Sequence, residues 1–208
     1  SFLTPEQEER VRRFSRDESQ RQYVFSHVAL SWLMKKYLGN SAESVSIVKN
    51  KHGKPLLKGS DLVFNLSHSG DCALIGFSRG VELGVDIERV RARDALLNLM
   101  DRYYTKSERL WVLAACEREE ELGRFYQVWV CKEAYLKSVG VGLTRDLRSF
   151  SVRWGEGFAF DIHCGGGAEK WCGVASELDV GVSKYCSSYC VNKSILSVRA
   201  FKWHSTMF

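Results

Sequence analysis

No segment of this sequence is apolar for long enough to cross a membrane, because its longest apolar runs fall far short of the roughly 20 residues that a spanning helix needs. Residues 1–13 are charged and have no apolar centre, so they lack the pattern of a secretory signal. The seven cysteines are odd in number and irregularly spaced, which disfavours a disulfide framework and favours a reducing compartment. We therefore predict a cytoplasmic protein without a membrane partner.

Long runs of one charge are also absent. The 30 Lys and Arg residues outnumber the 25 Asp and Glu residues, which gives a net charge of +5, but the basic residues are spread along the chain. This distribution argues against a nucleic-acid-binding arm. A basic protein of this kind suits an anionic small molecule or an acidic protein, so we expect no nucleic-acid partner.

The 208 residues, of which 45% are hydrophobic, allow one large domain or two small ones with a real core. Apolar residues recur every four positions from Val24 to Trp32, which predicts a helix over 18–38. Patterns typical of strands follow over 45–48, 62–66, 72–77 and 83–87. A Ser-His-Ser-Gly turn is predicted between the second and third of these strands.

The second half repeats this order of elements. Thr105 and Glu108 form a capping-box pattern that should open a helix. A long helix is predicted over 122–139, ending at Gly140, and strands are predicted over 150–154, 158–162, 171–175 and 194–203. Helices followed by strands in each half predict an α+β fold with two lobes.

Two carboxylates should share one face of the strand over 83–87, because Asp86 and Glu88 are two positions apart. Such a pair is repulsive unless a cation lies between them, and Mg²⁺ prefers carboxylate oxygens supplemented by phosphate and water. A solvated edge strand with Arg89 and Arg91 nearby is the alternative interpretation.

Glu133 and Lys137 are four positions apart in the predicted long helix, so they share a face, with Trp129 one turn earlier. A functional pair and an ordinary surface ion pair both have this spacing. A third signal is Ser67 and His68, which precede a glycine at the end of a strand and could bind phosphate through hydroxyl, imidazole and backbone N–H groups. A hairpin turn capped by the histidine is the alternative there.

Five segments occur in a fixed order along the chain: Gly-Lys-Pro-Leu at 53–56, Phe-Asn-Leu-Ser-His-Ser-Gly at 64–70, Gly-Val-Asp-Ile-Glu at 84–88, Trp-Val-Cys-Lys-Glu-Ala-Tyr-Leu-Lys at 129–137 and Gly-Val-Gly-Leu at 140–143. Taken together and in this order, they resemble the 4′-phosphopantetheinyl transferase superfamily, and in particular its long, monomeric, surfactin-synthetase-activating type with eukaryotic features. The resemblance implies two similar lobes related by a pseudo-twofold axis, 1–83 and 84–208, each with a small antiparallel sheet packed on helices.

The resemblance also implies an activity. The protein would transfer 4′-phosphopantetheine from coenzyme A to a serine hydroxyl of an acyl or peptidyl carrier protein, with release of adenosine 3′,5′-bisphosphate. It would be a monomeric holo-[acyl-carrier-protein] synthase that uses Mg²⁺, with Mn²⁺ as an alternative, and fatty acid biosynthesis is one of its expected pathways.

The implied site residues follow from matched positions. Asp86, Glu88 and Glu133 match metal ligands, and Glu133 is the predicted general base. Lys137 matches the lysine that contacts the pyrophosphate, and it completes a predicted catalytic set with Asp86 and Glu133. The remaining matches are to coenzyme A: Ser67 and His68 at its phosphates, and Arg10, Lys49, Lys51, Gly53 and Lys54 around its adenine and 3′-phosphate.

Three other functions are compatible with parts of the sequence. A Mg²⁺-dependent hydrolase of coenzyme A would use the same acids with water as the nucleophile. A non-catalytic basic module would bind RNA or an acidic protein. A zinc site would use Cys164, Cys172, Cys186 and Cys190, but their spacings match no common zinc pattern.

Overall fold

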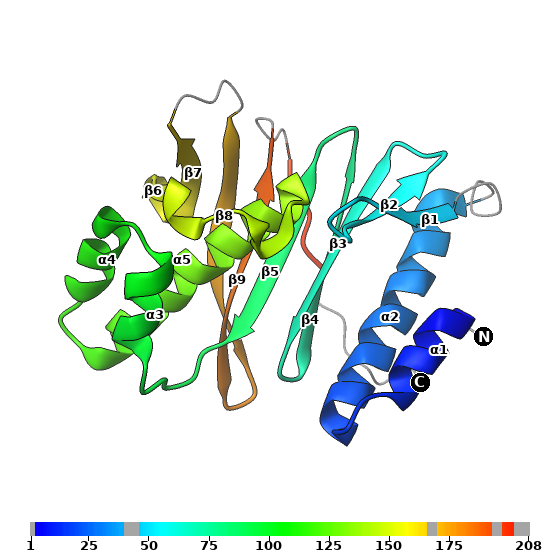
Figure 1. Ribbon diagram of the computed structural model, residues 1–208, viewed down its shortest axis with the longest axis horizontal. Coiled ribbons are helices and arrows are strands. Elements are labelled where there is room, and N and C mark those ends of the chain that lie inside the picture. Colours follow the sequence, from blue (N-terminus) through cyan, green and yellow to red (C-terminus); the bar gives the residue numbers. More distant parts are fainter. Residues whose placement is uncertain (1–2, 40–45, 166–169, 193–196, 202–208) are drawn as a thin grey trace.

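The structure is a computed structural model that describes residues 3–39, 46–165, 170–192 and 197–201. Helices and small antiparallel sheets alternate along the chain, which confirms the predicted α+β class. None of the helices in the described ranges is both long enough and apolar enough to span a bilayer. Figure 1 shows the helices α1 and α2 on one side of the molecule and α3 to α5 on the other.

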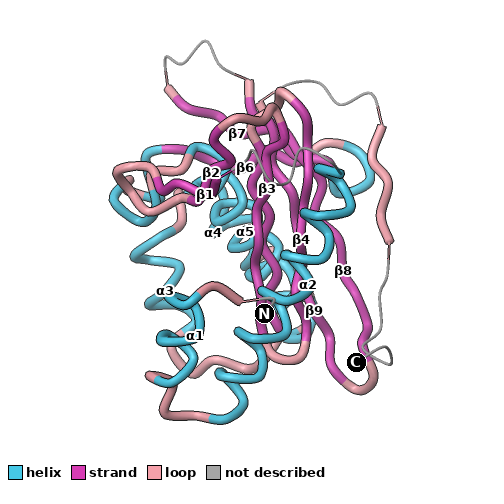
Figure 2. Tube along the Cα trace, turned by 90° about the vertical axis from the view of Figure 1, so that its right-hand side faces the viewer, coloured by secondary structure: helices cyan, strands magenta, loops and turns pink. Residues whose placement is uncertain are grey.

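The N-terminal part consists of two helices and two separate hairpins. Leu30 and Met34 of the long helix pack against Phe64 of the second hairpin and form a small core. In Figure 2 this helix runs beside the hairpin. The elements are α1 (Pro5–Arg12), α2 (Asp17–Leu38), β1 (Ser46–Lys49), β2 (Pro55–Lys58), β3 (Leu62–Ser69) and β4 (Cys72–Arg79).

The C-terminal part contains a five-stranded antiparallel sheet in the order β5-β9-β8-β7-β6. Its strands are β5 (Leu83–Arg89), β6 (Phe150–Trp154), β7 (Ala159–Cys164), β8 (Trp171–Val180) and β9 (Ser183–Val191). Its helices are α3 (Leu96–Tyr103), α4 (Lys106–Leu113), α5 (Arg118–Val139) and the short 3₁₀ turns Gly142–Thr144, Leu147–Ser149 and Glu156–Phe158. The main core lies between α5 and this sheet.

The long helix α5 positions most of the site, and its ends follow from local chemistry. It begins four residues before the predicted start, because Glu119, Glu120 and Glu121 form an acidic first turn that favours a helix N-terminus. It ends at Gly140, whose positive φ of 73° is the left-handed conformation that glycine adopts without strain. The predicted capping box of Thr105 and Glu108 is confirmed at the start of α4.

Two predictions about strands were wrong. The Ser-His-Ser segment is part of β3, not a turn, since Ser67, His68 and Ser69 pair in register with β4. The turn is the two residues that follow, and Gly70 supplies the positive φ of 52° that a two-residue hairpin loop requires at its first position. The other error is the strand over 194–203, because 197–201 form no strand and the rest of it lies outside the described residues.

The sheet is completed instead by β9, in a stretch where no strand was predicted. β9 is rich in Ser and Cys and has Val191 as its one β-branched residue, so its sequence has a weak strand signal despite its two tyrosines. It is buried between β5 and β8, and neighbouring strands satisfy its backbone on both edges. Two lobes divided after residue 83 and related by a pseudo-twofold axis stay a prediction.

Candidate functional site

The strand β5 lies unusually close to the helix α5. A side chain at Gly84 would place its Cβ 2.0 Å from the carbonyl oxygen of Ala134 and 2.4 Å from the amide nitrogen of Ser138. Only glycine permits this approach of two backbones. The approach brings the carboxylates of β5 to the polar side chains at the end of α5.

One hydrogen-bonded cluster joins three elements at this place. The Lys137 ammonium of α5 donates to Asp86 Oδ1 on β5 at 2.6 Å and to Ser67 Oγ on β3 at 2.8 Å. Ser67 in turn donates to the same Asp86 oxygen at 2.7 Å. Asp86 is only 4% exposed, and its other oxygen, Oδ2, has no hydrogen-bond partner in the described part of the chain. A buried oxygen of this kind is available to a ligand.

The carboxylate of Glu133 belongs to the same site. Burial is the main cause that raises its pKa from 4.5 to about 7, the negative charges of Asp86 and Glu88 add to the rise, and the Lys137 ammonium opposes it. Burial also raises the pKa of Glu88, and a hydrogen bond from Ser69 Oγ at 2.8 Å opposes that shift. Three acidic groups and one ammonium therefore interact within one region. Their roles as metal ligands, base and phosphate contact stay predictions.

The strand β3 faces this region with polar side chains at alternate positions. Asn65 Oδ1 accepts from the Val85 amide at 2.8 Å, and Ser69 Oγ accepts from the Arg89 amide at 3.1 Å. These side chains bond to the outer edge of β5, where no strand of the described residues pairs with it by backbone. Sequence reasoning missed Asn65 and Ser69, although the period of two that puts Ser67 on this face puts them there as well.

His68 is the one predicted residue of this segment that points away from the cluster, since it alternates with Ser67 and Ser69 and is exposed. Although the residue is exposed as a whole, desolvation of its ring by the surrounding protein is the main cause that lowers its pKa, and the positive charges of Lys137 and Arg10 add to the effect. Arg10 of α1 therefore lies close enough to His68 to affect its pKa. The guanidinium of Arg10 lies over the ring of Tyr23, 5.1 Å from its centroid.

The predicted residues of the basic turn between β1 and β2 differ in their exposure and in their partners. Lys49 forms an exposed ion pair with Glu6 at 3.0 Å, while Lys51 and Gly53 are exposed at the tip. Lys54 is buried, and its ammonium donates to the carbonyl oxygen of Ser138 at 2.7 Å and to Glu82 Oε2 at 2.9 Å.

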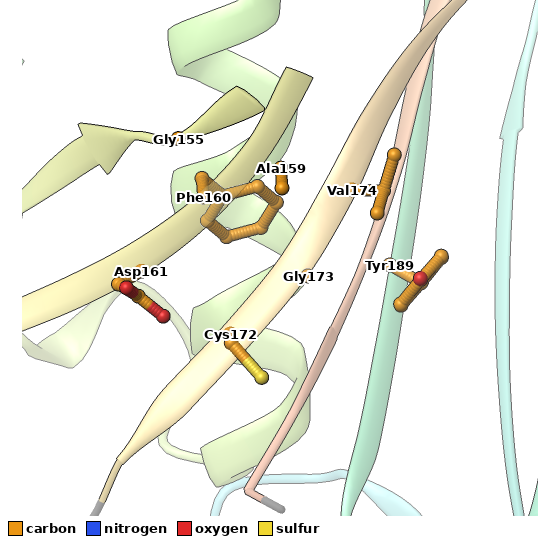
Figure 3. Close-up of a pocket in the computed structure, with 8 residues that line it drawn as sticks. All are labelled: Gly155, Ala159, Phe160, Asp161, Cys172, Gly173, Val174 and Tyr189. Carbon is orange, nitrogen blue, oxygen red and sulfur yellow. The ribbon is translucent and has the colours of Figure 1, made fainter. Parts of the chain in front are cut away.

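Within the described ranges, no three or more His, Cys, Asp or Glu side chains are arranged as a ready metal site. All seven cysteines are free thiols, and the four considered as zinc ligands are spread over β7, β8 and β9. A depression of about 220 Å³ lies on these same strands. Figure 3 shows its lining residues, which include Asp161, Cys172 and Tyr189. None of its lining residues belongs to the acidic cluster.

Comparison with known families assigns both halves of the chain. Residues 82–190 match the family model described as the 4′-phosphopantetheinyl transferase superfamily, which is more than half of the sequence. The chain belongs to the 4′-phosphopantetheinyl transferase superfamily. Residues 1–78 match a second model, described as a 4′-phosphopantetheinyl transferase N-terminal region. The family predicted from the order of the motifs is thereby confirmed.

Individual transferases of this superfamily agree with the assignment. The chain is 30% identical to 4′-phosphopantetheinyl transferase Sfp of Bacillus subtilis, over 74% of this chain and 67% of that protein. It is 31% identical to the transferase HetI of a Nostoc species, over 69% and 62%. It is 26% identical to the mouse L-aminoadipate-semialdehyde dehydrogenase-phosphopantetheinyl transferase, over 68% and 49%. The chain thus spans about two thirds of the bacterial relatives and half of the mouse protein.

Proposed function

We propose that this phosphopantetheinyl transferase homologue moves 4′-phosphopantetheine from coenzyme A to a serine hydroxyl of an acyl or peptidyl carrier protein. The observation that carries the proposal is the cluster of Lys137, Asp86 and Ser67 beside a carboxylate, Glu133, whose pKa is raised to about 7. Phosphoryl transfer needs a base for the incoming hydroxyl and positive charge at the phosphate oxygens. This cluster contains both.

Glu133 is the proposed general base. A base works best when its pKa lies near the working pH, because it is then ionised and still holds a proton firmly enough to remove one from a hydroxyl. An exposed glutamate, with its ordinary pKa of 4.5, would be ionised but a poor proton acceptor. Burial beside Asp86 and Glu88 raises the pKa of Glu133 into the useful range. Glu133 would accept the serine proton as the hydroxyl oxygen attacks the β-phosphate of coenzyme A.

Lys137 is the proposed electrostatic partner of that phosphate. An ammonium group has three donors, and two of them are used on Asp86 and Ser67. The third donor remains for a phosphate oxygen, while Asp86 and Ser67 fix the direction of the side chain. A fixed charge of this kind stabilises the negative charge that grows on the phosphate during transfer.

The acidic residues also fit Mg²⁺ by their chemistry. Hard divalent cations prefer carboxylate oxygens supplemented by substrate phosphates and water. Asp86 Oδ2 is buried and uncommitted, and a cation would offset the burial that chiefly raises the pKa values of Glu88 and Glu133 as well as the carboxylate repulsion that adds to it. We propose these three residues as its ligands, with the cation drawing together carboxylates that form no ready metal site in the described part of the chain. When bound, Mg²⁺, or Mn²⁺ in its place, would neutralise charge on the pyrophosphate.

Binding of the two partners rests on charge. Coenzyme A carries several phosphates, and we propose that Ser67, His68 and Arg10 contact them. The positive charge of Arg10 contributes to the lowered pKa of His68, which supports a shared role of these two side chains. The net charge of +5 would speed encounter with coenzyme A and with an acidic carrier surface. We further propose that the protein acts in the cytoplasm as a monomeric holo-[acyl-carrier-protein] synthase and that it serves fatty acid biosynthesis.

The test is transfer to a carrier. The protein is incubated with coenzyme A, Mg²⁺ and an apo acyl carrier protein, and the carrier is examined by mass spectrometry. The expected result is the mass of one added phosphopantetheine on its serine. Formation of adenosine 3′,5′-bisphosphate from coenzyme A without a carrier would favour the hydrolase instead, and no product in either case would contradict both.

A further inference from the structure

The end of α5 next to Lys137 is held by two side chains of the turn between β1 and β2. The last carbonyl groups of a helix have no partner within the helix, so its final turn tends to fray unless other groups bond to them. Here Lys54 Nζ donates to the Ser138 carbonyl at 2.7 Å, and Asn50 Nδ2 donates to the Gly140 carbonyl at 2.9 Å. The ammonium of Lys54 also complements the negative end of the helix dipole.

The turn itself is rigid around Asn50. The side-chain oxygen Oδ1 of Asn50 accepts from the amides of His52 and Lys54, both at 2.9 Å, and the Asn50 amide donates to the Lys54 carbonyl at 2.9 Å. One asparagine therefore closes the turn with its oxygen and reaches α5 with its nitrogen. Two side chains that hold a helix end are most effective when their own backbone is fixed in this way.

Gly140 shows that the fit is close. A Cβ at this position would lie 2.7 Å from Lys54 Cδ and 2.9 Å from Asn50 Nδ2. The glycine is therefore required by the contact with the turn as well as by its positive φ.

The charge around Lys54 argues against a direct role with a phosphate. Its side chain is 6% exposed, and its ammonium is already paired with Glu82 at 2.9 Å. A phosphate that approached Lys54 would meet the Glu82 carboxylate as well, and like charges at this range repel. The resemblance to the family had assigned Lys54 to the adenine and 3′-phosphate of coenzyme A, whereas its contacts in the structure are those of a group that binds the protein itself.

We propose that Lys54 and Asn50 are positioning residues for Lys137. By holding Ser138 and Gly140 they fix the last turn of α5, and so fix the Lys137 ammonium on Asp86 and Ser67. This inference deepens the proposed function, on which its kinetic test rests. It also has a structural consequence that does not depend on transfer.

Transfer kinetics measured with coenzyme A and with 3′-dephospho-coenzyme A as donors distinguish a positioning residue from a ligand of the 3′-phosphate. If Lys54 positions Lys137, Lys54→Met lowers kcat by about tenfold or more with both donors, and the ratio of their kcat/KM values stays that of the wild type. If Lys54 binds the 3′-phosphate, the variant loses kcat/KM with coenzyme A only, and the proposal is wrong. Lys58→Met, at an exposed lysine of the same hairpin, is the matched control and keeps wild-type values with both donors.

Amide hydrogen exchange provides the test that is independent of activity. In the free protein, Asn50→Ala and Lys54→Met are each expected to speed exchange over 137–141 by about tenfold, while exchange in the middle of α5 is unchanged. Asn50→Ala carries no change of charge, so it also serves if Lys54→Met fails to fold. Unchanged exchange over 137–141 in both variants would overturn the proposal, whereas failure of the wild type to modify a carrier would overturn only the proposed function.

Discussion

Replacing Glu133 by glutamine should remove transfer and, at the same time, stabilise the folded protein above neutral pH. The folded protein keeps the Glu133 proton until about pH 7, whereas an unfolded chain releases it near the ordinary value of 4.5. Between these values the unfolded state binds fewer protons, so the free energy of unfolding falls as pH rises. The stability that this group contributes is complete below the unfolded pKa and is lost as pH passes the folded pKa. Glutamine has the same shape and does not titrate.

The magnitude follows from the same difference. A pKa raised from 4.5 to about 7 corresponds to about 3 kcal/mol, since each pH unit is worth about 1.4 kcal/mol. Glu133→Gln should therefore be more stable than the wild type by up to about 3 kcal/mol near pH 8 and nearly equal to it near pH 4. Coenzyme A with Mg²⁺ should reduce this difference in stability between the variant and the wild type, because these ligands would bind the ionised form of Glu133 and stabilise the wild type.

The assay is urea denaturation at several pH values, with EDTA present and coenzyme A absent. Glu119→Gln is a control on the same helix, because Glu119 is exposed and paired with Lys184, which lowers its pKa; it should show no gain at high pH. The reasoning would be refuted if the Glu133→Gln variant were no more stable than the wild type near pH 8, or if it were more stable by the same amount at every pH. A wild-type rate of transfer in that variant would refute the role of Glu133 as the base.

Three further substitutions test the structure around the cluster. Asp86→Ala should lose Mg²⁺-dependent transfer, and a metal titration like that of the wild type would show that Asp86 is not a ligand. Gly84→Ala should cost more than about 3 kcal/mol in thermal unfolding, since its Cβ would meet a carbonyl oxygen of α5 at 2.0 Å, while Gly165→Ala, which meets nothing, should not. Glu108→Ala should cost about 3–5 kcal/mol in urea denaturation, because the pair with Lys132 at 2.9 Å is fully buried and its loss leaves that ammonium with carbonyl partners only.

Local sequence signals were sufficient for several elements of the fold. The capping box at Thr105, the long helix that ends at Gly140 and the strand Phe150–Trp154 depend on neighbours within a few positions, and all three were predicted. The strand β9 was missed for the opposite reason. Its Ser, Cys and Tyr residues form a strand because β5 and β8 lie on either side of it, which no local pattern records.

The site likewise combines features that local sequence patterns predict with features that depend on tertiary contacts. Periodicity placed Asp86 with Glu88, and Glu133 with Lys137, because each pair shares one face of one element. That the two faces meet follows from the approach of β5 to α5 at Gly84, which involves residues about 50 positions apart. Asn65 and Ser69 were missed because their partners are backbone amides of β5, which look alike in every sequence.

The order of the motifs was enough to identify the superfamily and to name the acidic residues and the lysine of the cluster. The pKa of Glu133 and the placement of Lys137, in contrast, come from the tertiary structure. The raised pKa of Glu133 depends on burial and on charges from another element, and the placement of Lys137 depends on carbonyl groups bonded by Lys54 and Asn50. Both effects depend on distances in space between groups far apart in the chain, and such distances exist only after folding.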